Sequence, residues 1–375
     1  MTYLLAALVA SAVIYQIVAI IAALRQLYAR PQPKQFSGGV SILKPVRGLD
    51  PNFYPAIRSH ALQDYAEFEL LFGVGSLDDP AVKHIRRLQA EFPHVSIQVI
   101  ESMTLAPNGK VAVLEDLEKH ARYPLRVVND SDIAVEPDYL TRVLSPLNDP
   151  ETGLVTCLYR ATADAWPGRW EALGIATDFA PSVMVAPLVG VNEFGLGATL
   201  AFRAADLRRI GGFAAIADYI ADDYRLGKKI SDLGLKVYLS EVVVETALSG
   251  DSWQHQLRWA RVIRVSQAGG YAGLPITNAT LWAIVCAAEG WWGPAACLLV
   301  LRIAMGLIAG TAVLRCRLTA RLWWLMPFRD VLGLAVWAAG LFGTSVRWRD
   351  RVLELDRHGR IQEANALARG RGSVG

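Results

Sequence analysis

The chain has 375 residues, of which 53% are hydrophobic, and its mean hydropathy of +0.27 lies above that of an average soluble protein. Its formal net charge is only +3, so we expect no strongly polyanionic partner and no nucleic acid. The composition therefore predicts an integral membrane protein. The cysteines form no CxxC pair and are interpreted as reduced packing residues; they are Cys157, Cys286, Cys297 and Cys316.

The first apolar segment is typical of a membrane anchor. Residues 2–24 carry no charge and are about as long as the roughly 20 residues that cross a bilayer. A cleaved signal peptide is the alternative, but no basic region precedes the apolar core, whereas Arg25, Arg30 and Lys34 follow it. We expect an uncleaved transmembrane anchor over residues 1–27, with the following domain in the cytosol.

Strands that alternate with helices are predicted in the next part of the chain. Short apolar runs lie between longer amphipathic stretches, at residues 40–45, 68–74, 95–100 and 125–128. This alternation is typical of a parallel sheet in an α/β domain, which we place over residues 36–270. Asp78-Asp79-Pro80 is a helix start, and Asp130-Ser131-Asp132 directly follows a strand. Both acidic groups are expected at the carboxyl edge of the sheet, where open α/β sheets bind ligands.

The acids after the last of these strands suggest a metal and diphosphate site. Asp130 and Asp132, two residues apart, are suited to coordinate Mg²⁺ or Mn²⁺ together with diphosphate oxygens. A solvated turn is the alternative, but the preceding strand and the upstream acids favour ligand binding. Lys110 begins a predicted helix and is expected to reach a donor phosphate or a nearby acid, with a solvated lysine as the alternative. Gly195-Leu196-Gly197 indicates either close approach of the backbone to a substrate or a simple turn.

Two further motifs are candidates for the chemistry of transfer. Asp222 and Asp223 begin a predicted helix, where they either favour the helix dipole or supply a general base, preferably Asp223. A helix over residues 251–267 places His255 one turn before Arg258 and Trp259. Arginine neutralises a leaving diphosphate and tryptophan provides a flat wall, whereas a basic helix lying on lipid headgroups is the alternative.

The C-terminal part is predicted to return to the membrane over residues 278–346. It contains an apolar stretch at 280–314, broken at Gly290–Pro294, and a further span at 325–346. We expect one of these segments to be re-entrant or to lie along the membrane interface. Its charges indicate either a helix-to-helix ion pair or a lipid-acceptor groove; they are Glu289, Arg302 and Asp330. Residues 347–375 are predicted to form a polar basic tail with a short helix at 353–368.

With these residues in place, the chain resembles the family 21 glycosyltransferases, which include ceramide glucosyltransferases and bacterial hopanoid-biosynthesis glycosyltransferases. The resemblance covers residues 40–264 and rests on motifs in the family's order: Lys44-Pro45-Val46-Arg47-Gly48, Asp78-Asp79-Pro80, Asp130-Ser131-Asp132, Tyr219-Ile220-Ala221-Asp222-Asp223-Tyr224 and Arg258-Trp259. It implies a GT-A fold and inverting transfer from a UDP-sugar with a divalent metal.

The resemblance also implies residue roles. Asp78 or Asp79 would lie near the uridine, Asp130 near the metal and diphosphate, and Asp223 would be the base. Two positions differ from the family's pattern: His255 stands where Gln or Arg is usual, and Asp132 stands where animal ceramide enzymes tend to have glycine.

The favoured function is transfer of one sugar, N-acetylglucosamine or glucose, from a UDP-sugar to a lipid hydroxyl. An alanine- and arginine-rich composition with few lysines has a bacterial character, which favours a hopanoid polyol such as bacteriohopanetetrol and a bacterial inner membrane. Ceramide is the alternative acceptor. A processive polysaccharide synthase would need a larger set of C-terminal spans, and a non-catalytic membrane scaffold would give no reason for the order of the motifs.

Overall fold

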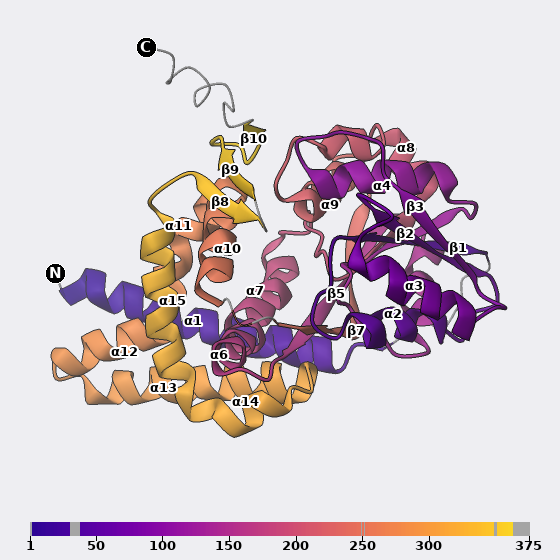
Figure 1. Cartoon of the computed structure of the whole chain (residues 1–375). Helices are drawn as coiled ribbons and strands as arrows, with labels where there is room; N and C mark the ends of the chain where they lie inside the picture. The colour runs from indigo at the N-terminus through magenta and orange to yellow at the C-terminus, as the bar shows by residue number, and fades with distance from the viewer. Residues whose placement is uncertain (1, 31–37, 249, 251, 349–350, 363–375) are drawn as a thin grey trace, which may run out of the picture.

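The computed structural model describes residues 2–30, 38–248, 250, 252–348 and 351–362. A seven-stranded sheet with its helices forms one end, and a group of apolar helices forms the other (Figure 1). The strands follow the order β3-β2-β1-β4-β6-β5-β7 across the sheet, with bounds β1 Val40–Val46, β2 Phe68–Val74, β3 Ser96–Glu101, β4 Leu125–Val128, β5 Thr152–Thr162, β6 Leu200–Arg203 and β7 Lys236–Ala247.

The expected parallel arrangement is found in the first four strands. β1 runs parallel to both β2 and β4, and β2 runs parallel to β3, whereas β6 is antiparallel to both of its neighbours. The sheet is therefore mixed rather than wholly parallel. Every residue of β1 is buried, because helices cover both faces, which is why this strand is an unbroken apolar run in the sequence.

Helices on the two faces enclose separate cores. Ile42 and Leu70 belong to the core under α2 and α3, while the adjacent Leu43 and Leu71 belong to the core under α4 and α9, as the two-residue period of a strand requires. The helices of this end are α2 Phe53–Ala61, α3 Pro80–Glu91, α4 Gly109–His120, α5 Tyr139–Leu144, α8 Ala204–Arg209 and α9 Asp222–Ser231.

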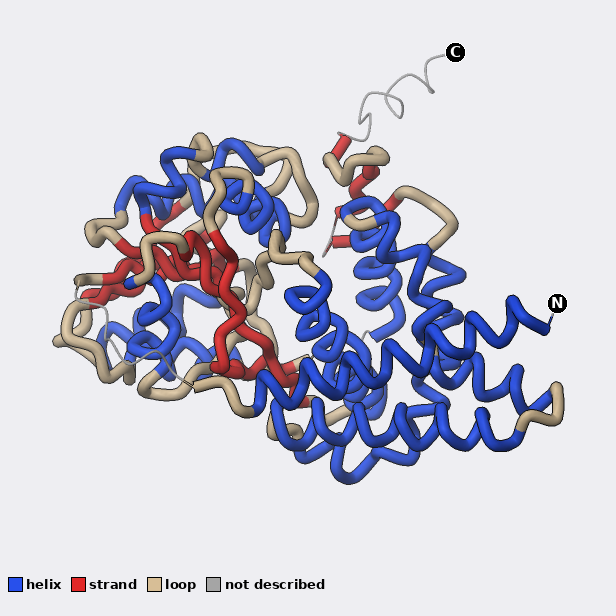
Figure 2. Tube along the Cα trace, turned by 180° about the vertical axis from the view of Figure 1, so that it is seen from behind, coloured by secondary structure: helices blue, strands red, loops and turns tan. Residues whose placement is uncertain are grey.

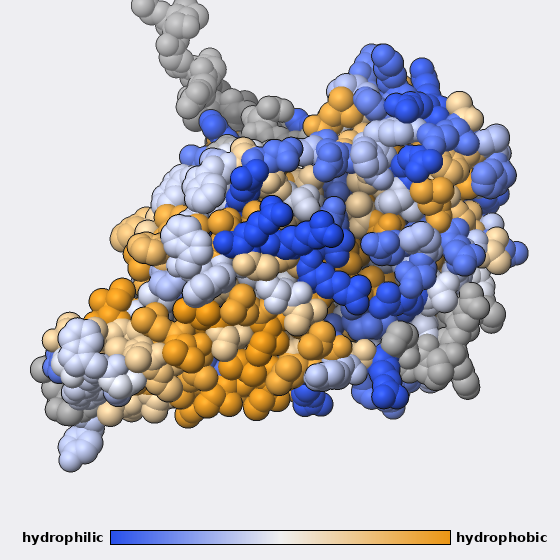
Figure 3. All heavy atoms as spheres, turned by 90° about the horizontal axis from the view of Figure 1, so that it is seen from below, coloured by the Kyte–Doolittle hydropathy of each residue, from blue (hydrophilic) through white to orange (hydrophobic). Residues whose placement is uncertain are grey.

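The apolar end contains helices with the length and composition to cross a membrane. Three such segments lie within the described residues, Tyr3–Leu27, Trp166–Val189 and Trp292–Val313, and a bent pair is a fourth candidate. Figure 2 shows the helix at the N-terminus running alongside other helices of this end, and Figure 3, seen from below, shows a broad hydrophobic patch on this end of the molecule. The helices are α1 Thr2–Leu27, α6 Trp166–Gly174, α7 Ala180–Val185, α10 Ser252–Ser266, α11 Ala268–Thr277, α12 Ala279–Ala288, α13 Trp292–Leu307, α14 Arg317–Leu322 and α15 Met326–Gly340.

One of these segments was not foreseen as an apolar helix. Trp166–Val189 lies within the region assigned to the globular domain, yet α7 packs against α1, and both belong to one hydrophobic cluster with the end of α13. The sheet domain and the apolar helices thus share an interior instead of meeting at a linker.

The predicted break near Gly290 is confirmed, and the predicted last span contains a helix shorter than a straight bilayer crossing. α12 and α13 form a hairpin whose turn places Gly290 at φ 77°. The span expected over residues 325–346 contains α15, which has 15 residues and so measures about 22 Å, short of a hydrocarbon core of about 30 Å. The chain then enters a strand at Ser345, which ends the helical segment.

The predicted C-terminal helix is wrong for the residues described. Strands β8 Ser345–Trp348, β9 Arg351–Leu355 and β10 Ile361–Gln362 form a small antiparallel sheet, while residues 363–375 lie outside the described part. A turn with Gly359 at φ 76° interrupts the helical spacing. Val346, Leu355 and Ile361 bury against Ile220, a partner that local periodicity does not reveal.

Candidate active site

The centre of the site lies where β4 ends. All residues of β4 are buried, and the chain reaches the edge of the sheet at Asn129. The side-chain amide of Asn129 donates a hydrogen bond to the Ala198 carbonyl at 2.7 Å. One residue later, the Asp130 backbone N–H donates to the Gly197 carbonyl at 3.2 Å. The turn that carries Asp130 is therefore tied to the loop before β6, and its carboxylate stands at the edge predicted from the sequence.

Lys110 joins the acids of two distant elements. Its Nζ lies 2.8 Å from Asp130 Oδ1 and 3.2 Å from Asp222 Oδ2. Asn108 caps α4 through its side-chain oxygen, which fixes the first turn and aims the lysine at the acids. Burial alone would lower the pKa of Lys110, but Asp130 and Asp222 outweigh it and raise that pKa. Of the two expected partners, donor phosphate or nearby acid, the structure shows the acids.

Asp223 approaches the same point from the start of α9. Its Oδ2 accepts a hydrogen bond from the Gly197 N–H at 2.9 Å, and its Oδ1 accepts one from the Tyr224 N–H at 2.7 Å. Burial, and then the charge of Asp222, raise the pKa of Asp223 to about 6, against the opposing effect of Lys110. A carboxyl group with this pKa is a proton acceptor suited to near-neutral pH.

Gly197 brings these groups together because it has no side chain. A Cβ at this position would lie 2.8 Å from Asp130 Oδ2 and 3.4 Å from Asp223 Oδ2. The loop therefore approaches two carboxylates closely, and its approach to a substrate stays a prediction.

A buried lysine holds the Asp130 turn through a hydrogen bond to its backbone. Lys44 on β1 is fully buried, and its Nζ donates to the Asp130 carbonyl at 3.1 Å. Burial lowers the pKa of Lys44 to about 7, although Asp132 and Asp130 oppose this effect. Lys44 was noted in a motif but not predicted as a site residue, because its burial depends on the sheet neighbours of β1.

The pair Asp130 and Asp132 fits a divalent cation that is completed by ligands from outside the protein. Asp132 accepts a hydrogen bond from Thr246, and burial and the adjacent Asp130 raise the pKa of Asp132 to about 6. A dication would relieve this repulsion between carboxylates. No group of three or more His, Cys, Asp or Glu side chains arranged for a metal occurs in the described part of the chain, so the remaining ligands would come from diphosphate oxygens and water.

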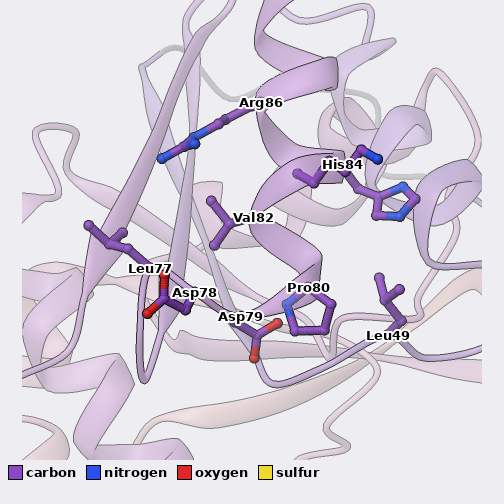
Figure 4. Close-up of a pocket in the computed structure, with 9 residues that line it drawn as sticks. Leu49, Leu77, Asp78, Asp79, Pro80, Val82, His84 and Arg86 are labelled. Atoms are coloured by element: carbon purple, nitrogen blue, oxygen red, sulfur yellow. The ribbon is translucent and has the colours of Figure 1, made fainter.

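Asp78 and Asp79 separate into two roles. Asp79 caps α3 by accepting from the Ala81 N–H at 2.9 Å, and it also accepts from the Gly48 N–H at 2.8 Å. Asp78 is exposed, and its carboxylate makes no hydrogen bond with the described residues. Both line a shallow cleft of about 450 Å³, where Figure 4 shows them side by side at the entry to the helix. The cleft includes none of the acids around Lys110. Since Asp79 is occupied by backbone N–H groups, Asp78 is the one of the pair whose carboxylate faces solvent.

Helix α10, which carries basic and aromatic side chains, forms another side of the candidate site. His255 and Trp259 on α10 lie with ring centroids 5.1 Å apart, as predicted for residues one turn apart, and Trp259 packs 6.5 Å from Tyr159. Burial, and then the charges of Asp223 and Glu171, raise the pKa of Tyr159. Arg258 lies between His255 and Trp259 in the sequence, on the same helix.

The later arginines of α10 have structural partners. Arg261 donates to the Ser345 carbonyl at 2.6 Å, and Arg264 donates to the Gly343 carbonyl at 2.6 Å. They hold the chain that leaves α15, so the expectation that lipid headgroups engage this helix receives no support from these two side chains.

Besides Lys44, further residues near the site were not predicted as functional. Ser131 donates to Asp50 Oδ2 at 2.5 Å, and the charge of Asp50 contributes to the raised pKa of Asp132. Glu171 on α6 contacts His255 Nδ1, and Tyr159 packs against Trp259. A single acid near the start of an apolar helix was the available signal for Glu171, whereas nothing local identifies Tyr159.

Comparisons with known proteins identify the family and the fold of the chain. A profile described as Glycosyl transferase family 21 matches residues 4–361. Ceramide glucosyltransferase 1 of Caenorhabditis elegans is 27% identical over 227 residues, covering 60% of this chain and 48% of the relative. Ceramide glucosyltransferase 3 of the same organism is 28% identical over 206 residues, which cover 54% of this chain and 44% of the relative. The chain thus spans about half the length of these curated relatives.

A solved structure supports the fold. The mannosyltransferase PcManGT from Pyrobaculum calidifontis, in complex with GDP-Man and Mn²⁺, has a TM-score of 0.55 and 18% identity, covering 90% of this chain and 98% of that one. This likeness shows the shared GT-A architecture. Since the family profile extends over nearly the whole sequence, from the first membrane helix to the last described strand, the chain belongs to glycosyl transferase family 21.

Proposed function

We propose that the protein is a membrane-bound inverting glycosyltransferase that moves one sugar from a UDP-sugar to a lipid hydroxyl. The observation that carries this proposal is the convergence of Asp130, Asp222 and Asp223 around Lys110 at the carboxyl edge of the sheet. Two of these acids have distinct chemical environments: the Asp130 side chain is half-exposed, while Asp223 is partly buried and has a raised pKa. This is the division expected between a group that meets the donor and a group that takes a proton.

The donor would bind along the sheet edge. In this proposal the exposed Asp78 meets the nucleoside, and Asp130 with Asp132 faces the diphosphate. A bound Mg²⁺ or Mn²⁺ would supply positive charge to the diphosphate oxygens. Lys110 is positioned to lose one acid partner and meet a donor phosphate instead, and Arg258 on α10 is the second candidate cation for the leaving group.

The acceptor hydroxyl would react at Asp223. Its carboxylate takes the hydroxyl proton, the acceptor oxygen forms a bond to the anomeric carbon, and the bond from that carbon to the diphosphate oxygen breaks. UDP leaves with the bonding electron pair. One direct displacement inverts the anomeric configuration and needs no covalent enzyme intermediate.

The apolar helices support a lipid acceptor, since several of them lie against the site and have the composition of membrane spans. We favour a hopanoid polyol such as bacteriohopanetetrol, because the composition has a bacterial character. Ceramide is the second candidate, which the names of the curated relatives favour. N-acetylglucosamine and glucose are the candidate sugars, and a bacterial inner membrane with a cytosolic site is the proposed location.

The test uses purified protein in lipid nanodiscs with Mg²⁺ or Mn²⁺. UDP-glucose and UDP-N-acetylglucosamine are each offered against ceramide and bacteriohopanetetrol, and products are identified by mass spectrometry. We expect one glycolipid product, lost on metal chelation and in Asp223→Asn. Asp232→Asn is the matched control, because Asp232 lies just after the same helix, pairs with Lys228 at the surface and is 57% exposed. Absence of product with every pair, or full activity of Asp223→Asn, would contradict the proposal.

A further inference from the structure

Helix α6 carries an acid where the surrounding sequence is apolar. Glu171 lies in Trp166–Val189, a segment with the composition of a membrane span, and its side chain is only 5% exposed. A carboxylate buried among apolar side chains costs free energy unless it has a hydrogen-bond partner. Its partner is Nδ1 of His255, on α10, which is 84 residues away in the chain. The pair is therefore built by the fold and not by local sequence.

The contact with Glu171 determines the tautomer and the orientation of the His255 ring. Since a carboxylate accepts hydrogen bonds, Nδ1 must be the protonated nitrogen, and in the neutral ring the lone pair is then on Nε2. The ring of Trp259 lies 5.1 Å from that of His255 and limits its rotation. The His255 side chain is 28% exposed, and no described residue hydrogen-bonds to Nε2. A fixed, accessible acceptor nitrogen therefore remains.

The location of the pair indicates which substrate it would meet. Trp259, which lies beside His255, also packs against Tyr159 on β5, with ring centroids 6.5 Å apart, so the pair adjoins the strand that leads from the central sheet to α6. Helix α10 packs against the apolar helices α6, α11 and α15. The donor-binding acids lie instead on the loops of the sheet. Nε2 is thus on the side of the site from which a lipid would enter.

We propose that Glu171 positions His255 so that Nε2 accepts a hydrogen bond from a hydroxyl group of the lipid acceptor. This inference rests on the proposed transferase function and deepens it by assigning the acceptor subsite. His255 touches the substrate, whereas Glu171 acts through His255 and is a positioning residue. The ligand class is a lipid alcohol, because a neutral imidazole nitrogen accepts a hydrogen bond from O–H and offers nothing to an anionic headgroup.

The direct test observes the ring nitrogens of the wild-type protein. The full chain, labelled with ¹⁵N-histidine, is placed in nanodiscs with and without added ceramide or bacteriohopanetetrol, and His255 is assigned by its absence in His255→Gln. We expect the Nδ1–H tautomer, a shift of the unprotonated Nε2 signal on addition of one of the lipid alcohols, and no shift with UDP-sugar alone. An Nε2–H tautomer, or a signal unaffected by either lipid alcohol, would overturn the inference.

Kinetics separates this role from a merely structural one. Glu171→Gln and His255→Gln should raise the KM for the acceptor about tenfold, the effect of losing about 1.4 kcal/mol of binding, while the KM for the donor stays unchanged. Exposed His94 and Glu151 supply the controls His94→Gln and Glu151→Gln. An equal rise in both KM values would contradict the acceptor assignment. A lipid-dependent Nε2 shift without any glycosylated product would instead remove the proposed reaction and leave the lipid contact.

Discussion

Two neighbouring aspartates show how position in the fold divides chemical roles at the scale of residues. Asp222 lies 3.2 Å from Lys110, which compensates its charge, while Asp223 accepts hydrogen bonds from backbone N–H groups at 2.9 and 2.7 Å. Burial raises the pKa of Asp223 to about 6, so that it holds a proton more tightly than an ordinary aspartate. Asp223 is therefore the better candidate for a base.

The pH dependence of the reaction follows from this pKa. Asp223 must be deprotonated to accept the hydroxyl proton, so kcat/KM should rise with pH up to about 6 and then level off, with about a tenfold loss per pH unit on the acid side. Initial rates of sugar transfer across a series of buffers measure this pH dependence. Asp132 has a similar pKa, so Asp132→Asn serves as the control: it should lower the rate but keep the acid limb. A rate that does not change across this range would rule out Asp223 as the base.

Gly197 gives a second prediction at this scale. In Gly197→Ala the new methyl group would lie 2.8 Å from Asp130 Oδ2, closer than such contacts allow, so the carboxylate must move. Displacement of a catalytic group by about 1 Å can cost about a hundredfold in rate, which is the expected loss of kcat. Gly269→Ala, in helix α11 where no atom lies within 4 Å of the new methyl group, should retain activity. Equal rates for the two variants would contradict the crowding argument.

At the scale of elements, the segment Trp166–Val189 connects the site to the membrane helices through a polar stripe. Glu171, Gly174 and Asp178 follow the three- to four-residue spacing of one helix face. Glu171 meets His255, the bare backbone of Gly174 makes room for the Arg329 guanidinium, and Asp178 pairs with Arg302 at 2.5 Å. Each contact joins this segment to a different helix, so the apolar segment is fixed against α10, α15 and α13.

The expected helix-to-helix ion pair is found here and predicts a large effect on stability. Arg302 on α13 pairs with Asp330 on α15 at 2.6 Å, and both side chains are 3% exposed. In Arg302→Met the two acids lose their cation, and breaking a buried pair costs about 3–5 kcal/mol. Thermal unfolding in nanodiscs should show a markedly lowered midpoint. Lys236→Met, which removes an exposed pair with Glu151, should change stability by less than about 1 kcal/mol. Similar midpoints for both variants would refute the prediction.

At the scale of the whole molecule, the end of the chain returns to the catalytic domain. The Ile220 N–H donates to the Gly359 carbonyl at 3.1 Å, and the Ile361 N–H donates to the Asp218 carbonyl at 2.7 Å. Tyr219 lies between the guanidinium groups of Arg225 and Arg360, at 4.2 and 5.5 Å. The loop that leads into Asp222 and Asp223 is thereby held by residues more than a hundred positions later.

This connection predicts that a remote substitution will impair catalysis. In Ile361→Asp an unpaired carboxylate enters the cluster of Val346, Leu355 and Ile220, so the small sheet should detach from the loop. We expect kcat to fall about tenfold or more while the central sheet stays folded, measured by transfer assays and by limited proteolysis after residue 344. Gln362→Asp changes the exposed neighbouring residue and should retain activity. Unchanged turnover of Ile361→Asp would show that the loop needs no such support.

The sequence by itself determined the elements whose signals are local. Buried parallel strands require unbroken apolar runs, which is why 68–74 and 125–128 were predicted at their observed bounds. Asp79 followed by Pro80 marks a helix start, and the apolar length of residues 3–27 marks a membrane span. Acids that directly follow strands could therefore be assigned to one sheet edge before the structure was known.

Only the tertiary structure decided how distant residues share a site. Lys110 pairs with acids instead of solvent because the end of β4 and the start of α9 meet beside it. Glu171 has a hydrogen-bond partner only because α10 places His255 beside it. The predicted helix at 353–368 was wrong because Leu355 and Ile361 gain more from burial against Ile220 than from a local helical pattern. Periodicity reports which face of an element is apolar, whereas the partner of that face is set by contacts between segments far apart in the chain.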